Sequence, residues 1–400
     1  MKKILVVMNT MGQAGAETAL LELLRHIDPA EYEVSLYVLM AQGEMVHELP
    51  DYVKLLNAHY DDSSVLGREG RAHMRRTVLR AMFARATVFH LFPYLIRNLA
   101  VMAAKGKILT DKLLWRVLSD SGQRFKEHYD LAVAYLEGGS AYYVADHVEA
   151  ARKAAFLHVD YGRAGYTRAL DRDCYLKFDK VFCVSKEVRE AFLQAYPECK
   201  TKSEVFHNLI NQDAIRKKAK LSGGFTDDYE GFRILTVGRL TAQKAFEVSI
   251  EAMKLLKEKG IRARWYVLGE GDQRSFLEEK IRHFHLEDDF LLLGASKNPY
   301  PYMAQADIYV HASRFEGKSI AIQEAQTLGC AILVSDCSGN REQVIPGVDG
   351  MMCGFTPEEI CRDIQTLLQD ESLRSRLGRA AAQKKLADES EVGKLLRLAN

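Results

Sequence analysis

Residues 3–24 read KILVVMNTMGQAGAETALLELL, a short aliphatic run followed by a glycine-containing turn and an amphipathic segment. Unbroken aliphatic runs are typical of parallel strands that helices cover on both faces. The stretch therefore predicts a buried strand over 3–8 and a helix that begins near Ala16. In a doubly wound sheet, ligands bind outside the carboxyl ends of the strands, so the turn between these two elements is a candidate binding loop.

The same alternation of aliphatic runs and helix-like segments continues along the chain in two series. The first series has runs at 34–40, 131–135, 155–158, 180–184 and 204–207, and the second has runs at 232–237, 265–268, 290–293, 308–310 and 331–334. A single core stops growing at about 250 to 300 residues, so a chain of 400 residues predicts two domains. We expect an α/β protein with two Rossmann-like, doubly wound parallel-sheet domains.

The polar stretch KLSGGFTDDYEG at 220–231 separates the two series and suits a linker. We therefore expect a first domain over 1–207, a linker region over 208–231, a second domain over 232–385 and a C-terminal helical tail over 386–400. Within the first domain, residues 60–125 interrupt the alternation and predict inserted helices.

The insertion is basic, with a net charge of +9 over residues 67–124 against +1 for the whole chain. It consists either of inserted helices with solvated charged faces or of a surface that docks on an anionic membrane. The docking residues would be Arg71, Arg75, Arg76, Arg80 and Arg85 with Met74, Val78, Leu79, Met82 and Phe83. His90, Pro93 and Arg97 interrupt the apolar stretch 88–104, which argues against a membrane span.

Composition restricts the class of protein further. Lys and Arg total 55 against 54 for Asp and Glu, so no global charge favours nucleic acid as a partner. The seven cysteines show no Cys-x-x-Cys spacing and indicate reduced thiols, and no cleavage site follows the N-terminal apolar run. We expect a cytoplasmic protein.

Three loops after predicted strands carry candidate binding residues. Gly12, Gln13, Ala14 and Gly15 form either an anion-binding loop at a helix N-terminus or a tight turn without a ligand. After the strand 232–237, Gly238, Arg239 and Lys244 flank the entrance to a helix near Phe246. Two cations there suit the charge of a diphosphate, although pairs of Arg and Lys are more often solvated surface charges.

The third loop is SRFEGKSIAIQEAQTLG at 313–329, which follows a predicted strand and opens a helix near Ser319. The free N–H groups of a helix N-terminus attract phosphate, and Gly317 permits close approach of the backbone. Glu316 and Glu324 can accept hydrogen bonds from sugar and ribose hydroxyls. A solvated helix face is the simpler account of Glu324.

Together these segments resemble glycosyltransferase family 4, the retaining enzymes of the GT-B fold. The resemblance rests on GQAGAE, VGRLTAQK, LGEGDQRSFLEE, NPYPYMAQAD, SGNREQV, GVDG and the E-x7-E motif EGKSIAIQE. It covers both domains in the same order, apart from the basic insertion and the last twenty residues.

The resemblance implies a role for each matched position. Arg239 and Lys244 would clamp the diphosphate, Glu316 would lie near the hydroxyls of the transferred sugar, and Glu324 would bind the ribose. The remaining implied contacts are the backbone of Gly294, Ala295 and Ser296 at the nucleobase, the loop Gly12–Gly15 at the acceptor and phosphate, and His158 near the reacting sugar.

Two departures from the family pattern affect specificity. Lys318 and Ser319 replace the commoner aromatic residue and proline, which predicts a more polar sugar pocket. The glycine loop lacks the frequent double glycine, so its acceptor contacts differ from the family pattern.

The expected reaction transfers a hexose from a UDP- or GDP-linked donor to a glycan or lipid-linked acceptor, as in the synthesis of cell-surface polysaccharide. No metal or other cofactor is expected, because Arg239 and Lys244 supply the positive charge. An epimerase or phosphorylase on the same architecture and a non-catalytic nucleotide-binding module are the alternatives. An NAD-dependent oxidoreductase is disfavoured, because the chain lacks the G-x-G-x-x-G fingerprint.

Overall fold

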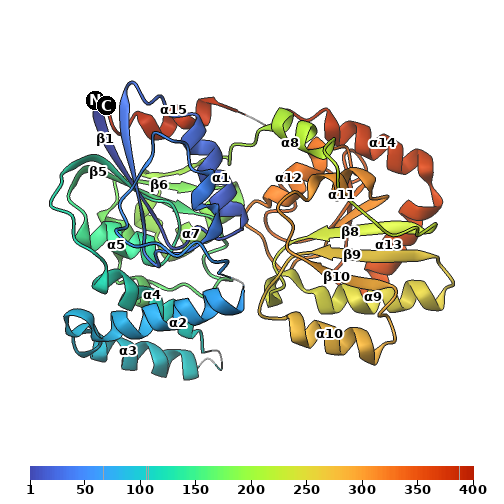
Figure 1. Cartoon of the computed structure of the whole chain (residues 1–400), viewed down its shortest axis with the longest axis horizontal. Coiled ribbons are helices and arrows are strands. Elements are labelled where there is room, and N and C mark those ends of the chain that lie inside the picture. The colour runs from blue at the N-terminus through green and yellow to red at the C-terminus, as the bar shows by residue number, and fades with distance from the viewer. Residues whose placement is uncertain (66, 105, 107, 387) are drawn as a thin grey trace. The chain divides into compact units, whose positions relative to one another are not determined.

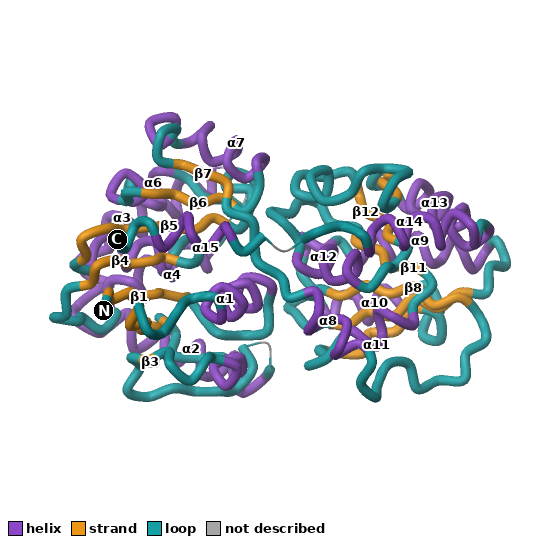
Figure 2. The backbone as a smooth tube through the Cα atoms, turned by 90° about the horizontal axis from the view of Figure 1, so that it is seen from above, coloured by secondary structure: helices purple, strands orange, loops and turns teal. Residues whose placement is uncertain are grey.

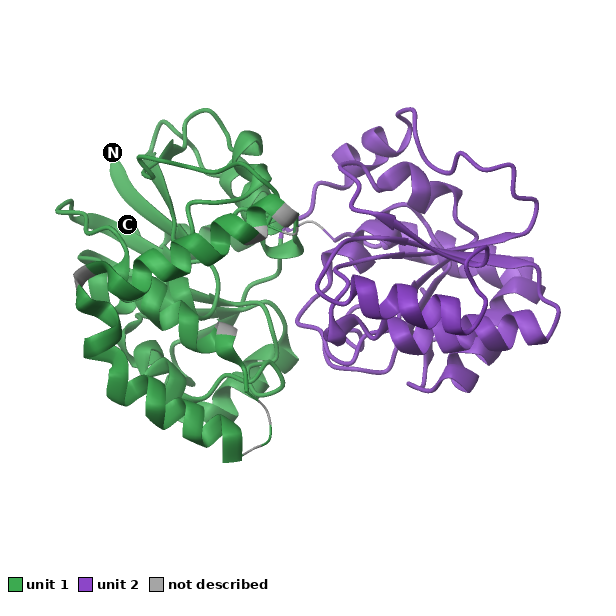
Figure 3. Cartoon of the chain, turned by 60° about the horizontal axis from the view of Figure 1, so that its bottom comes forward, with its two compact units in different colours: residues 1–208, 389–400 green, residues 209–388 purple. Residues whose placement is uncertain are grey.

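The computed structural model describes residues 1–65, 67–104, 106, 108–386 and 388–400. The chain divides into two compact units (Figure 3). Unit 1 contains Met1–Asn208 together with Glu389–Asn400, and unit 2 contains Leu209–Asp388.

Unit 1 is built on a parallel sheet with seven strands among the described residues, in the order β3-β2-β1-β4-β5-β6-β7. The order reverses between β1 and β4, as in a doubly wound fold. The strands are β1 (Lys2–Met8), β2 (Tyr32–Val38), β3 (Lys54–Leu55), β4 (Tyr129–Ala134), β5 (Ala150–Leu157), β6 (Lys180–Cys183) and β7 (Ser203–Val205).

Helices lie on both sides of the unit 1 strands (Figures 1 and 2). They are α1 (Gly15–Arg25), α5 (Gly139–His147), α6 (Arg168–Asp171), α7 (Lys186–Ala195) and α15 (Ser390–Leu396). The insertion between β3 and β4 adds α2 (Arg68–Phe83), α3 (Thr87–Ala104) and α4 (Thr110–Ser121), with α3 outermost in Figure 1. The 3₁₀ turns are Glu44–Glu48, Ala84–Ala86, Cys174–Lys177 and Pro197–Cys199.

A buried arginine attaches the insertion to the core of unit 1. Arg116 on α4 is fully buried, and its guanidinium donates to the Asp146 carboxylate at 2.5 Å and to the Asp171 carbonyl oxygen at 2.9 Å. Its guanidinium also lies 4.0 Å from the ring centroid of Tyr142. Because a buried charge is tolerated only when it is paired, this network fixes α4 against α5.

Unit 2 has a second parallel sheet, with six strands among the described residues in the order β10-β9-β8-β11-β12-β13. The strands are β8 (Phe232–Val237), β9 (Ala263–Leu268), β10 (Phe290–Gly294), β11 (Ile308–His311), β12 (Ile332–Ser335) and β13 (Met351–Cys353). The helices are α8 (Gln212–Ala219), α9 (Phe246–Glu258), α10 (Arg274–His283), α11 (Tyr300–Gln305), α12 (Ile320–Thr327), α13 (Pro357–Gln369) and α14 (Glu371–Ala382), with a 3₁₀ turn at Ala242–Lys244.

The last twelve residues belong to unit 1, although they follow unit 2 in the sequence. The Glu391 carboxylate accepts a hydrogen bond from the backbone N–H of His207, and Lys394 donates to the Val205 carbonyl oxygen. The side-chain amide of Asn400 donates to the hydroxyl of Tyr32 at 3.0 Å. The stretch expected as an appended tail is therefore a structural part of the first unit.

Candidate active site

The turn after β8 packs closely against the backbone that follows β9 in unit 2. The N–H of Gly238 donates to the Leu268 carbonyl, and the N–H of Leu240 donates to the Glu270 carbonyl at 2.9 Å. A Cβ atom at Gly269 would lie 1.9 Å from the Gly238 carbonyl oxygen, so only glycine fits there. The glycines of the LGEGD segment therefore support the loop that carries Lys244.

Three side chains meet at the carboxyl ends of β8 and β11. The Lys244 ammonium lies 2.6 Å from Glu316 Oε1 and 3.0 Å from His311 Nε2, and His311 Nε2 lies 3.1 Å from the same carboxylate oxygen. His311 and Glu316 are buried, at 1% and 6% exposed. The structure thus brings together two of the predicted residues and adds a histidine that the sequence analysis did not single out.

The protonation states of this cluster follow from its charges. Burial raises the pKa of the Glu316 carboxyl, but the charge of the Lys244 ammonium outweighs it and holds that pKa well below its usual range. Burial and then the charge of Lys244 lower the pKa of His311, so the imidazole is neutral. An ammonium has three N–H donors, and two of them point at Glu316 and His311, which leaves one for an anionic ligand.

The neutral tautomer of His311 is set by its neighbours. We assign the proton to Nδ1, because Nε2 then accepts from Lys244 while Nδ1 donates to the Tyr309 hydroxyl at 3.3 Å. That hydroxyl donates in turn to the Val237 carbonyl oxygen, the last residue of β8. His311 therefore links the ends of two strands to the side chain of Lys244.

The N-terminus of α12 is held in place by neighbouring backbone and by one amide. The N–H of Glu316 donates to the Ser338 carbonyl at 3.0 Å. Gln343 accepts from the N–H of Ser319 and donates to the carbonyl of Ser319, both at 2.8 Å. Ser319 is the N-cap residue of α12, and its side chain makes no capping hydrogen bond. The helix N-terminus is therefore fixed in position, and the N-cap side chain does not accept from the free N–H groups of its first turn.

Glu324 lies within α12 and is buried, at 8% exposed. Its carboxylate accepts a hydrogen bond from the Tyr300 hydroxyl at 2.9 Å. Burial raises the pKa of Glu324 to about 7, and the bond from Tyr300 only partly opposes that shift. A solvated helix face does not describe this residue, because its carboxyl is held out of water.

The other predicted donor-binding residues of unit 2 have different surroundings. Arg239 is exposed in the turn beside Gly238. Gly294 has a left-handed φ of 85°, and its carbonyl oxygen accepts from the N–H of Gly269 at 2.8 Å. Gly294 thus lies beside the LGEGD segment, Ala295 and Ser296 follow it, and Gly317 and Lys318 precede α12.

In unit 1, the predicted loop Gly12–Gly15 lies between β1 and α1. The N-cap residue of α1 is Ala14, whose methyl side chain cannot make a capping hydrogen bond. A Cβ atom at Gly43, whose φ is 128°, would lie 2.2 Å from the carbonyl carbon of Met11. The backbone of Gly43 therefore packs directly against the start of this loop at Met11.

His158 follows β5 at the same edge of the unit 1 sheet. Its backbone N–H donates to the Glu137 carboxylate at 3.0 Å, and the Glu137 carbonyl accepts from the side chain of Asn9, which follows β1. Burial lowers the pKa of His158 to about 4, so its ring is neutral. Its Nε2 atom is buried and has no hydrogen-bond partner among the described residues.

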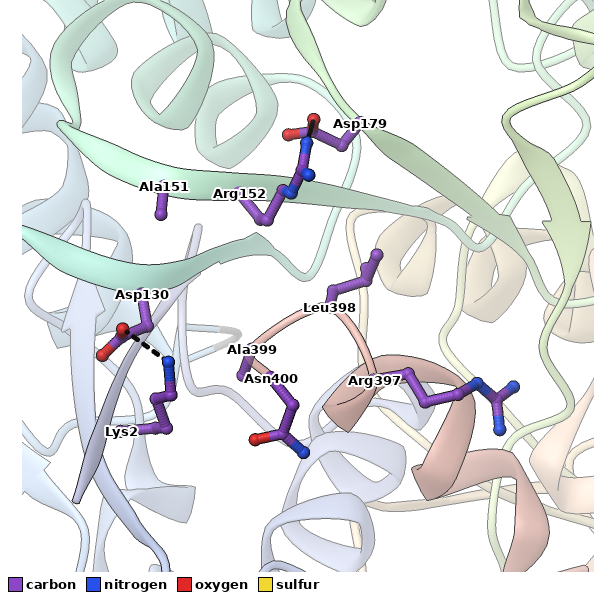
Figure 4. Close-up of a pocket in the computed structure, with 9 residues that line it drawn as sticks. All are labelled: Lys2, Asp130, Ala151, Arg152, Asp179, Arg397, Leu398, Ala399 and Asn400. Carbon is purple, nitrogen blue, oxygen red and sulfur yellow. Dashed lines mark hydrogen bonds and ion pairs between the residues drawn. The ribbon is translucent and has the colours of Figure 1, made fainter.

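A separate pocket of about 470 Å³ lies at the opposite edge of the unit 1 sheet (Figure 4). It is lined by Lys2, Asp130, Ala151, Arg152, Asp179, Arg397, Leu398, Ala399 and Asn400. Lys2 pairs with Asp130 at 3.2 Å, and Arg152 pairs with Asp179 at 2.9 Å. Its strand residues stand at the amino ends of β1, β4, β5 and β6, and Arg397–Asn400 follow α15, so the pocket is not part of the predicted site.

Several neighbours of the predicted site residues, some in unit 1 and some in unit 2, were not singled out from the sequence. They are His311, Gln343, Tyr300, Asn9 and Glu137. The position of His311 at the end of the strand before the E-x7-E loop was a usable signal, because side chains at that edge face ligands. Gln343 and Tyr300 reach the site only through tertiary packing, which the local sequence does not reveal.

The fold that this topology defines is GT-B, with two Rossmann-like units. The structure of HepE from Anabaena in complex with UDP-glucose aligns with the whole of this chain over 98% of its own length. The TM-score is 0.67 and the identity is 16%. A TarM variant from S. aureus in complex with UDP aligns over the full length of both chains, with a TM-score of 0.68 and 13% identity.

Within that fold, residues 224–384 match the family model of glycosyl transferases group 1. A curated relative in Campylobacter jejuni is N-acetylgalactosamine-N,N'-diacetylbacillosaminyl-diphospho-undecaprenol 4-alpha-N-acetylgalactosaminyltransferase, 32% identical over 50% of this chain and 53% of its own length. The amylovoran biosynthesis glycosyltransferase AmsD of Erwinia amylovora is 28% identical over 38% of this chain and 42% of its own. The chain thus spans about half the length of these curated relatives.

Proposed function

We propose that this protein is a metal-independent, retaining glycosyltransferase of family 4. It transfers a hexose from a UDP- or GDP-linked donor to a glycan or lipid-linked acceptor, for cell-surface polysaccharide, on the cytoplasmic side of the membrane. The observation that carries the proposal is the cluster of Lys244, Glu316 and His311 before the N-terminus of α12. It lies inside the segment that matches the group 1 family.

The proposal assigns the donor to unit 2. Lys244 and Arg239 neutralise the diphosphate, and the N-terminus of α12 adds N–H donors to it. Glu316 accepts from hydroxyls of the hexose, and Glu324 accepts from the ribose. The backbone of Gly294–Ser296 contacts the nucleobase.

The acceptor is assigned to unit 1, at the loop Gly12–Gly15. The acceptor hydroxyl attacks the anomeric carbon from the side on which the diphosphate leaves, and an oxygen of the leaving phosphate takes its proton. The bond between the anomeric carbon and the phosphate oxygen breaks as the new glycosidic bond forms. His158 donates or accepts one hydrogen bond at the reacting sugar, which gives its buried Nε2 a partner.

The names of the similar proteins support this assignment. One relative is named for transfer of N-acetylgalactosamine to a diphospho-undecaprenol substrate, and another for amylovoran biosynthesis. One structural neighbour is described in complex with UDP-glucose. These descriptions belong to those proteins and motivate the choice of substrates to be tested here.

The test is a screen of UDP-, GDP- and ADP-linked hexoses that follows released nucleoside diphosphate, with and without candidate acceptors. We expect release to require an acceptor and to persist in EDTA. Turnover of the donor without an acceptor would favour an epimerase or phosphorylase. Loss of activity in EDTA that Mn²⁺ or Mg²⁺ restores would contradict the metal-independent mechanism.

A further inference from the structure

Helix α3 carries apolar side chains on a side that no described residue of unit 1 covers. Phe89, Phe92, Ile96 and Leu99 are 73%, 59%, 51% and 39% exposed. They are spaced by three and four residues, so they form one stripe along the helix. A solvent-facing helix surface normally carries polar residues, and an apolar stripe of this length indicates a surface that meets something apolar.

The opposite side of α3 is firmly attached to unit 1. Leu91 and Met102 are buried in clusters that include residues of α4. The Tyr94 hydroxyl donates to the Leu170 carbonyl at 2.9 Å, which ties the helix to α6. Among the described residues, α3 is the helix long and apolar enough to cross a membrane, with 22% of its length buried. Its attachment to the globular unit is compatible with lying along a membrane, not across it.

The structure corrects the set of apolar residues that the sequence analysis proposed for membrane contact. Met74, Val78 and Met82 of α2 pack against the buried cluster around Leu91 and Val117 and are not available. Leu79 and Phe83 are exposed, at 56% and 70%, and are spaced by four residues. The apolar residues available for membrane contact therefore lie in the last turns of α2 and on α3, not along most of α2.

The charges around the apolar stripe are of one sign. Arg75, Arg76, Arg80 and Arg97 are exposed. No Asp or Glu occurs between Glu69 and Asp111 in the sequence. The side chains of Arg71 and Arg85 lie outside the described residues. A second copy of this surface would bring like charges together, whereas an anionic lipid surface complements them.

We infer that α3 and the end of α2 dock unit 1 on an anionic phospholipid bilayer. Phe89, Phe92 and Ile96 enter the boundary between headgroups and acyl chains, and the four exposed arginines contact lipid phosphates. The inference deepens the proposed function by naming the surface that would bring unit 1 to a lipid-linked acceptor. The membrane contact itself does not depend on the proposed function, and only the role of the acceptor rests on it.

Helix α2, at one end of this surface, is connected to the Gly12–Gly15 loop through a few direct contacts. The Gln42 side-chain amide donates to the Gly70 carbonyl in the first turn of α2, and the Gln42 carbonyl accepts from the N–H of Met11. A Cβ atom at Gly12 would lie 2.5 Å from a Val65 methyl carbon, so the segment before α2 packs on the loop. A membrane contact on these helices therefore holds the Gly12 loop near the bilayer.

The test is co-sedimentation of the full chain with vesicles of equal parts phosphatidylglycerol and phosphatidylcholine, compared with phosphatidylcholine alone. The test variant is Phe89→Ser/Phe92→Ser, and the control is Phe276→Ser, a 49% exposed phenylalanine of unit 2. We expect binding to the anionic vesicles that weakens with salt, a loss of about tenfold or more in the double variant, and no change in the control.

The vesicle assay contains no nucleotide sugar, so a negative result would count against membrane docking and would leave the proposed function untouched. Absence of wild-type binding to anionic vesicles at low salt would overturn the inference, as would equal binding by the double variant. Light scattering that finds a dimer lost in Phe89→Ser/Phe92→Ser would also overturn it, because a second copy would then cover the stripe.

Discussion

At the carboxyl edge of the unit 2 sheet, the side chains of Lys244, Glu316 and His311 lie within 3.1 Å of one another. The same edge of the unit 1 sheet carries the backbone of the Gly12 loop and the neutral ring of His158. Two units with the same doubly wound topology therefore differ in the charge that they present. Because a diphosphate needs positive charge and an acceptor hydroxyl does not, this difference is the basis on which we propose that the donor binds unit 2.

The largest effect is expected from the ion pair of unit 2. In Lys244→Met, transfer should fall by about 10² to 10³, because the charge that develops on the leaving diphosphate loses its fixed partner. The same change leaves the buried Glu316 carboxylate unpaired and should destabilise the fold by about 3 to 5 kcal/mol. Steady-state kinetics and thermal unfolding measure the two effects.

The double variant Lys244→Met/Glu316→Gln separates stability from catalysis. Removal of both charges should restore most of the unfolding temperature while transfer stays low. The control Lys254→Met removes a partly exposed cation of α9 and should leave both quantities near those of the wild type. Recovery of transfer in the double variant would show that Lys244 serves only to neutralise Glu316.

The second effect is the pH dependence of donor binding through Glu324. Its pKa of about 7 in the folded protein lies above the usual value, so its contribution to stability is greatest at low pH and is lost as the pH rises towards 7. The ionised carboxylate accepts the ribose hydroxyls, so donor affinity should rise between pH 6 and 8.

Glu324→Gln tests this link between ionisation and ribose binding. The neutral amide keeps one acceptor oxygen but loses the charge, so we expect about tenfold weaker donor binding that no longer varies with pH. Titration of the nucleotide-linked hexose with the wild type and the variant between pH 6 and 8 provides the measurement. An unchanged pH dependence in the variant would assign the titration to another group.

An effect of similar size, on turnover and not on donor affinity, is expected in unit 1 from His158→Asn. Turnover should fall by about tenfold through loss of one hydrogen bond to the reacting sugar, whereas affinity for the nucleoside diphosphate should not change. Since the pKa of His158 is about 4, the ring stays neutral and its removal should not alter the pH profile above pH 6. A large loss of nucleotide affinity would place the donor at unit 1 instead.

The smallest effect on transfer is expected from Gly43→Ala. The added Cβ atom meets the backbone of Met11, and the φ of 128° disfavours any side chain. Displacement of the Gly12 loop should raise the KM for the acceptor by a few-fold, at a cost in stability of about 1 to 3 kcal/mol. Acceptor titrations at saturating donor test this, and a changed donor KM alone would contradict the division of roles.

The strands of both sheets were predictable because buried parallel strands are short aliphatic runs. The strands β3 and β13, of two and three residues at sheet edges, were not predicted. The return of Glu391 and Lys394 to unit 1 depends on contacts with residues more than 180 positions away. Such pairing is set by tertiary packing, which local periodicity does not encode.

The charged residues of unit 2 were predictable because their types and spacing carry the chemistry. Glu316 and Lys244, 72 positions apart, were nominated independently and are in contact in the structure. His311 was missed because a single histidine in an aliphatic strand reads as a core residue. The apolar stripe of α3 was also missed, because the sequence does not say which side of an amphipathic helix faces the protein.

The most direct test of the division between the two units is calorimetric titration of the full chain with UDP-, GDP- and ADP-linked hexoses. We predict that one of these donors binds the wild type and His158→Asn equally. Lys244→Met/Glu316→Gln and Glu324→Gln should each bind that donor at least about tenfold more weakly. Absence of binding heat with every donor, or equal affinity in all four proteins, would contradict the account.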